Sequence, residues 1–166
     1  MQSRVKLLGH PIHQMLVPIP LGLLVMAVVF DLVHAFGGYE GFAYVAFWNI
    51  VAGVIGGAVA AVFGVLDWRT IPSGTRAKRV GAYHAIGNLV LLALFTASAL
   101  ERAGEPGFLP STAGLALEIA GLALGAVTGW LGGELVDRLG VGVDDGAHLD
   151  APSSLTRKQA RLTPRV

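Results

Sequence analysis

The chain has 166 residues, of which 54% are hydrophobic and 14% are charged, and its formal net charge is +1. Soluble domains carry about 25% charged residues, so this composition predicts an integral membrane protein. The small net charge and dispersed basic residues argue against nucleic-acid binding. Because there is no cysteine, disulfides, thiolate metal sites and iron–sulfur clusters held by this chain are excluded.

Four apolar stretches are long enough to cross a bilayer, whose core of about 30 Å needs roughly 20 residues of helix. They lie at residues 14–35, 42–66, 80–100 and 113–136, with helix-stopping glycines and prolines between them. The expected fold is an all-α four-helix membrane bundle over residues 1–140. In the first span, Pro18 and Pro20 predict an irregular helix, because each removes a backbone donor.

Basic residues mark one end of the expected bundle: Arg4, Lys6, Arg69, Arg76, Lys78, Arg79 and Arg138. Arg102 alone flanks the other end. The positive-inside rule therefore predicts that both termini are cytoplasmic. Residues 141–166 are polar and too poor in apolar residues for a second core, which predicts a mobile cytoplasmic tail.

Small residues recur at helical spacing in two of the spans. The fourth span has a glycine at every fourth position, and the second has a shorter version: Gly121, Gly125, Gly129 and Gly133, then Gly53 and Gly57. Such patterns let helix backbones approach closely. Tight helix packing is one interpretation, and a groove for a flat cofactor is the other.

Ionisable residues gather at one depth on the cytoplasmic side: His10, His13, Asp67, His84 and Glu134. A rise of about 1.5 Å per residue places them all near the helix ends. His13 and Asp67, and likewise His84 and Glu134, open and close a helical hairpin, which suggests a twofold repeat. For Glu134 we expect either a histidine partner or an intrahelical pair with Arg138.

Three hypotheses follow from this layer. In the first, His13 and His84 bind b-type haem in an electron-transfer subunit, and Gly57, Gly125 and Gly129 make room for the porphyrin. In the second, a divalent metal ion is held by residues from the whole layer: His10, His13, His84, Asp67 and Glu134. In the third, the layer is an interfacial hydrogen-bond network in a structural or assembly subunit without a cofactor.

A second, looser layer of polar residues lies toward the other side: Asp31, His34, Asn49 and Glu118. We expect Glu118 to pair with His34 or Asn49, or to mark a proton path, because a carboxylate within a span is costly unless it has a partner. No phosphate-binding loop, nucleophile elbow or zinc-protease motif is present, which argues against hydrolases and nucleotide-driven enzymes. Whether the chain is an enzyme stays open.

Four motifs together carry a family resemblance: GHPIHQMLVPIPLG at 9–22, GVLDW at 64–68, IPSGTRAKRVGAYHA at 71–85 and GWLGGELVDRLGVGV at 129–143. They resemble the bacterial membrane family known as domain of unknown function 2231 over residues 5–145. The resemblance implies a four-helix unit in the bacterial cytoplasmic membrane, which some members join to a Rieske iron–sulfur domain. A redox partner of this chain, such as a Rieske-type protein, would then be a separate polypeptide, and a homo-oligomer stays open.

Overall fold

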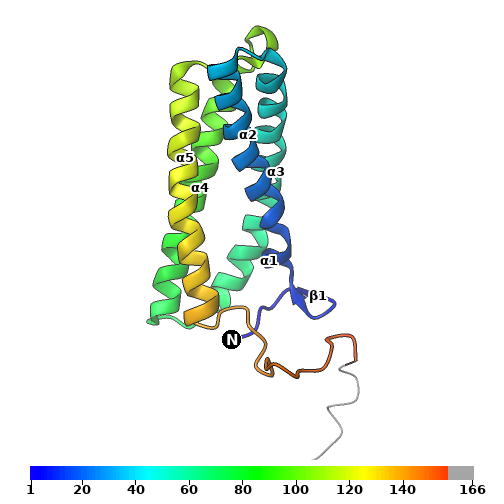
Figure 1. The fold of residues 1–166 in the computed structure, drawn as a ribbon. Helices are drawn as coiled ribbons and strands as arrows, with labels where there is room; N and C mark the ends of the chain where they lie inside the picture. The colour runs from blue at the N-terminus through cyan, green and yellow to red at the C-terminus, as the bar shows by residue number, and fades with distance from the viewer. Residues whose placement is uncertain (157–166) are drawn as a thin grey trace, which may run out of the picture.

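A computed structural model describes residues 1–156, so the last ten residues of the expected tail, 157–166, lie outside the described residues. Four helical spans stand side by side (Figure 1). The elements in chain order are β1 Lys6–Leu7, β2 His10–Pro11, α1 Ile12–Leu16, α2 Pro18–Gly37, α3 Glu40–Thr70, α4 Arg76–Arg102, η1 Pro106–Phe108, α5 Thr112–Gly133 and η2 Glu134–Arg138.

The predicted four-helix membrane fold is confirmed. The spans at 12–37, 40–70, 76–102 and 112–138 are each long and apolar enough to cross a membrane. They extend beyond the predicted stretches because polar residues cap the helices and form their last turns. The Thr75 and Ser111 side chains accept hydrogen bonds from backbone N–H groups of the first turns of α4 and α5, respectively.

The first span is interrupted where its prolines predicted an irregular helix. α1 ends at Leu16, and α2 begins at Pro18, a position that suits proline because the first helical N–H has no intrahelical partner. Between them, the Val17 N–H still donates to the His13 carbonyl at 3.1 Å. The interruption therefore separates the turn that carries His13 from the long helix that carries Asp31.

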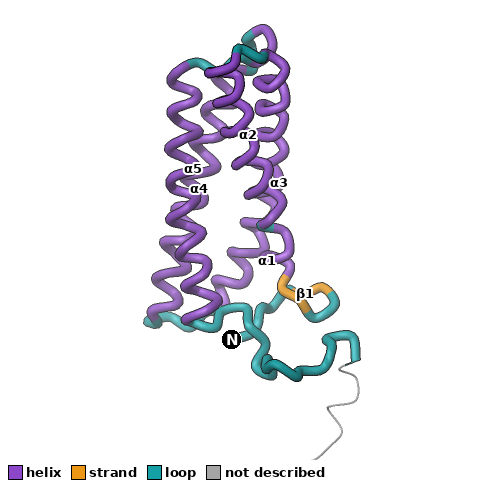
Figure 2. The backbone as a smooth tube through the Cα atoms, in the orientation of Figure 1, coloured by secondary structure: helices purple, strands orange, loops and turns teal. Residues whose placement is uncertain are grey.

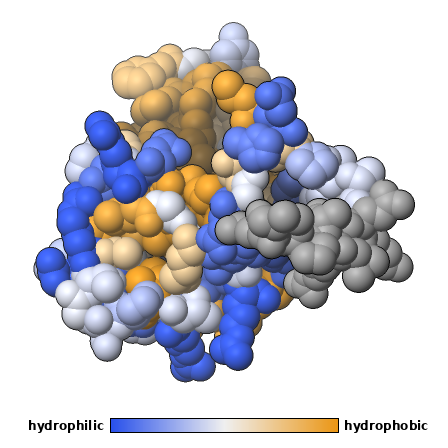
Figure 3. Space-filling model, turned by 90° about the horizontal axis from the view of Figure 1, so that it is seen from below, coloured by the Kyte–Doolittle hydropathy of each residue, from blue (hydrophilic) through white to orange (hydrophobic). Residues whose placement is uncertain are grey.

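The spans form two hairpins, α1–α2 with α3 and α4 with α5 (Figure 1). Both hairpins turn at the same end of the bundle, which we call the opposite end and which contains residues 38–39 and 103–111. The terminal end contains Met1, the α3–α4 connection and residues 139–156 (Figure 2). Seen from the terminal end, hydrophilic residues lie at the rim and apolar helix surface is visible between them (Figure 3).

The two hairpins repeat the same close contacts. A Cβ on Gly53 would lie 2.7 Å from the Leu24 side chain, and a Cβ on Gly121 would lie 2.8 Å from the ring of Phe95. Phe95 is 71 residues after Leu24, and Gly121 is 68 residues after Gly53. The hairpins are therefore related as the sequence suggested, with one register for the outgoing helices and another for the returning ones.

The N-terminal segment forms a tight hairpin against the described part of the tail. Leu8 and Gly9, between β1 and β2, both have positive φ, 52° and 91°, as in a type I′ turn. The Ser154 hydroxyl donates to the Leu8 carbonyl at 2.8 Å, and the Gly142 N–H donates to the Met1 carbonyl at 2.9 Å. Up to residue 156, the tail thus contacts the segment that leads into α1.

Candidate functional site

Two histidines at the terminal end have the same anchoring geometry. The His13 Nδ1 lies 2.8 Å from the carbonyl oxygen of Ala60 on α3, and the His84 Nδ1 lies 2.9 Å from the carbonyl oxygen of Thr128 on α5. A carbonyl only accepts hydrogen bonds, so each Nδ1 carries the proton and donates. In the neutral ring, Nε2 then keeps its lone pair, which is the form that binds iron or another metal.

A glycine one turn beyond each carbonyl makes room for the imidazole. A Cβ on Gly64 would lie 2.9 Å from His13 Cε1, and a Cβ on Gly132 would lie 3.2 Å from His84 Cε1. Gly132 is 68 residues after Gly64, and His84 is 71 residues after His13. The two imidazole seats are therefore equivalent positions of the repeated hairpin.

The two seats differ in what meets Nε2. In the second hairpin, the Asn88 amide nitrogen lies 3.2 Å from His84 Nε2, and the Thr128 hydroxyl donates to Asn88 Oδ1 at 3.2 Å. The equivalent of Asn88 in the first hairpin is Val17, which has no amide. The two imidazoles also interact electrostatically with each other across the bundle.

The three glycines expected to make room for a porphyrin have different surroundings. A Cβ on Gly57 would lie 2.7 Å from the Leu92 side chain, and a Cβ on Gly125 would lie 3.1 Å from that of Leu91. Leucine side chains therefore fill the space beside these two glycines, as in tight helix packing. A Cβ on Gly129 would meet no neighbouring side chain of residues 1–156 within 4 Å.

The acidic members of the expected layer bind other partners. Asp67 accepts hydrogen bonds from the Ser3 hydroxyl at 2.7 Å and from the Arg4 backbone N–H at 3.1 Å. Glu134 pairs with Arg76 at 2.5 Å, so neither partner expected for it, a histidine or Arg138, is the one it contacts.

His10 is exposed beside the tail, with its Nε2 3.5 Å from the Ser154 hydroxyl. Within the described part of the chain, no three His, Asp or Glu residues are grouped closely enough to hold a metal ion. The five residues of the expected layer, His10, His13, Asp67, His84 and Glu134, thus do not converge on one point.

A buried charged cluster lies toward the opposite end. Arg102 Nη1 donates to Asp31 Oδ2 at 2.7 Å and lies 3.7 Å from Glu118 Oε1, while the Ser98 hydroxyl donates to the same Glu118 oxygen at 2.5 Å. The expected partners of Glu118, His34 and Asn49, are therefore replaced by Ser98 and Arg102. The sequence placed Arg102 at the membrane surface, but its side chain is only 1% exposed.

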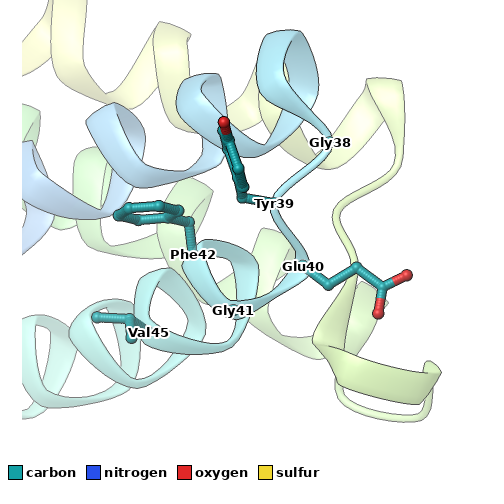
Figure 4. A pocket seen from close by; sticks show the side chains of 6 residues that line it. All are labelled: Gly38, Tyr39, Glu40, Gly41, Phe42 and Val45. Atoms are coloured by element: carbon teal, nitrogen blue, oxygen red, sulfur yellow. The ribbon is translucent and has the colours of Figure 1, made fainter.

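A shallow groove at the opposite end follows the turn between α2 and α3. It is lined by Gly38, Tyr39, Glu40, Gly41, Phe42 and Val45, and the Glu40 carboxylate points away from the aromatic rings (Figure 4). Tyrosine and phenylalanine at a helix end suit the interface between lipid and water. This groove brings no chemically reactive side chains together.

The spans, the lipid-compatible apolar exterior and the polar ends define a multi-pass membrane protein of four helices. The chain belongs to the family described as predicted membrane protein (DUF2231), which matches residues 9–145. The resemblance inferred from the four motifs is thereby confirmed. No curated protein and no solved structure matches the chain.

Proposed function

We propose that the protein is a b-type haem-binding electron-transfer subunit in which His13 and His84 are the two axial ligands. The observation that supports this is the matched anchoring of their Nδ1 atoms on the Ala60 and Thr128 carbonyls. Each anchor fixes the tautomer and the ring orientation, and it leaves Nε2 as the ligating nitrogen. Hydrogen bonding of the distal ring nitrogen is the usual support of a metal-bound histidine.

The residues present fit a two-histidine ligand set better than a metal site of four side chains. Structural zinc sites use about four protein ligands, and catalytic ones use about three. Asp67 and Glu134 already have partners, and His10 lies beside Ser154. Haem iron needs only two axial protein ligands, because the porphyrin supplies the other four. When bound, the haem would accept and release one electron.

The chain itself would hold the imidazoles and exclude water from the site. Gly64 and Gly132 allow the rings to lie against α3 and α5, where a larger side chain would displace them. Asn88 must leave His84 Nε2 for iron to bind there, and Val17 shows that the fold accommodates an apolar residue at the equivalent position. Both termini would be cytoplasmic, so a separate redox partner would approach the basic terminal end.

An absorption spectrum of the purified protein, expressed with added haem precursor, tests this proposal. We expect a Soret band and the sharp visible bands of six-coordinate, low-spin haem. H13A and H84A should each lose the low-spin spectrum, whereas H10A, which removes a histidine of the same end outside the pair, should keep it. N88V should retain or increase haem occupancy.

Two outcomes would contradict the proposal. One is the absence of a Soret band in the folded wild-type protein after haem supplementation. The other is a low-spin spectrum that survives both H13A and H84A. Elemental analysis of the same samples provides a second measurement, because one equivalent of zinc, copper or iron without porphyrin would support the divalent-metal alternative instead.

A further inference from the structure

We propose that the buried cluster of Asp31, Arg102 and Glu118 binds one exchangeable proton, which the two carboxyl groups share. This site lies toward the opposite end of the bundle, away from the histidine pair, and does not depend on haem. Its ligand is a proton that is taken up from the aqueous side at the opposite end.

The first argument is the charge balance of the cluster. Asp31 and Glu118 are 0% exposed and Arg102 is 1% exposed, so water does not screen their charges. Two carboxylates and one guanidinium leave one negative charge uncompensated within the membrane span. Isolated charges there are costly, and a single proton on either carboxyl group makes the cluster neutral.

The second argument is the set of polar atoms that lack a partner. Among residues 1–156, these buried atoms make no hydrogen bond: Asp31 Oδ1, His34 Nδ1, Arg102 Nε, Arg102 Nη2 and Glu118 Oε2. A buried polar atom without a partner costs about 1–3 kcal/mol. The Asp31 and Glu118 carboxyl groups face each other closely enough for a hydrogen bond when one of them is protonated. One proton therefore satisfies both carboxyl groups.

The surrounding groups favour a proton over a metal cation. The guanidinium of Arg102 already contacts both carboxyl groups, at 2.7 and 3.7 Å, and would repel a second cation. On α3, the neighbour is the ring of Phe47, 5.9 Å from the guanidinium carbon. The remaining polar groups that face the cluster are His34 on α2 and Ser98 and Glu101 on α4. A hard cation would need about six oxygen ligands.

A cleft of about 240 Å³ connects this region to the opposite end. Arg102 lines it together with Glu101, Glu105 and Ser111. Glu101 accepts a hydrogen bond from the Ser111 hydroxyl, and a Cβ on Gly114 would lie between Glu101 Oε2 and Ser98 Oγ. The acidic wall of the cleft thus continues through Ser98 to Glu118, which gives protons a polar route to the cluster.

Infrared spectroscopy of the full chain in phosphatidylcholine vesicles at neutral pH tests the proposal. We expect a C=O stretching band of a protonated carboxyl group, which shifts to lower frequency in D₂O because the proton exchanges. E118Q and D31N should each remove the band, since either change leaves one carboxylate balanced by Arg102. The matched control is E105Q in the cleft, which should keep the band.

Absence of the band from the wild-type protein would overturn the proposal, and so would a band that does not shift in D₂O. A band that persists in either E118Q or D31N would overturn the sharing of the proton. The wild-type spectra test the proposal even if a variant fails to fold. Because the samples contain no haem, the result is independent of the experiment on the histidine pair.

Discussion

Removing Arg102 should destabilise the protein strongly. The Arg102–Asp31 contact is 2.7 Å long and lies out of water. Two unit charges at this separation attract by about 6 kcal/mol at an effective dielectric constant of about 20. The cost of desolvating both ions offsets part of this attraction. Loss of one partner from a buried ion pair therefore costs about 3–5 kcal/mol, which we expect for R102M.

A double-mutant cycle separates the ion pair from simple packing. D31L leaves Arg102 beside Glu118, so its cost should be smaller than that of R102M. The double variant D31L/R102M should be more stable than the sum of the single effects predicts, by about 2 kcal/mol, because neither charge is left unpaired. Unfolding in mixed micelles, followed by circular dichroism, measures all four proteins. Additivity within about 0.5 kcal/mol would refute the reasoning.

Three further predictions concern packing, capping and orientation. G121A should destabilise the protein by about 1–3 kcal/mol, because its Cβ would lie 2.8 Å from the buried ring of Phe95, whereas G129A should change the free energy of unfolding by less than about 0.5 kcal/mol; equal effects would contradict this. T75A should cost about 1 kcal/mol in the same unfolding assay and T75S much less, since serine keeps the cap. In this cysteine-free chain, D150C should react with a membrane-impermeant maleimide in inside-out vesicles and not in intact cells; the reverse pattern would place the terminal end outside.

The fold could be predicted from the sequence because length and hydropathy decide which segments cross a bilayer. The histidine pair could also be selected, since polar residues stand out in apolar helices. The glycines at the imidazoles could not, because Gly132 lies outside the every-fourth pattern of α5 and only the packing shows that it faces His84. Spacing alone does not show which face of a helix meets its neighbour.

The partners of Glu134 and Glu118 required the three-dimensional structure for two different reasons. η2 is a π-helical turn in which the Leu139 N–H donates to the Glu134 carbonyl, so Arg138 no longer lies one α-helical turn above Glu134 and Arg76 takes its place. Arg102 is the last residue of α4, a position typical of a surface cation. Asp31 lies on another helix, and no local pattern indicates that the two side chains meet.

The repeated hairpin has a consequence for how the two halves of the chain recognise each other. Arg102 is 71 residues after Asp31, the same spacing that relates His84 to His13, so the ion pair joins equivalent positions of the two halves. Two copies of the first half, associated with the same symmetry, would bring aspartate against aspartate, and two copies of the second would bring arginine against arginine. Such like-charge contacts disfavour pairing of identical halves. If the chain were divided in the α3–α4 connection, the fragments should therefore assemble as a heterodimer in preference to either homodimer.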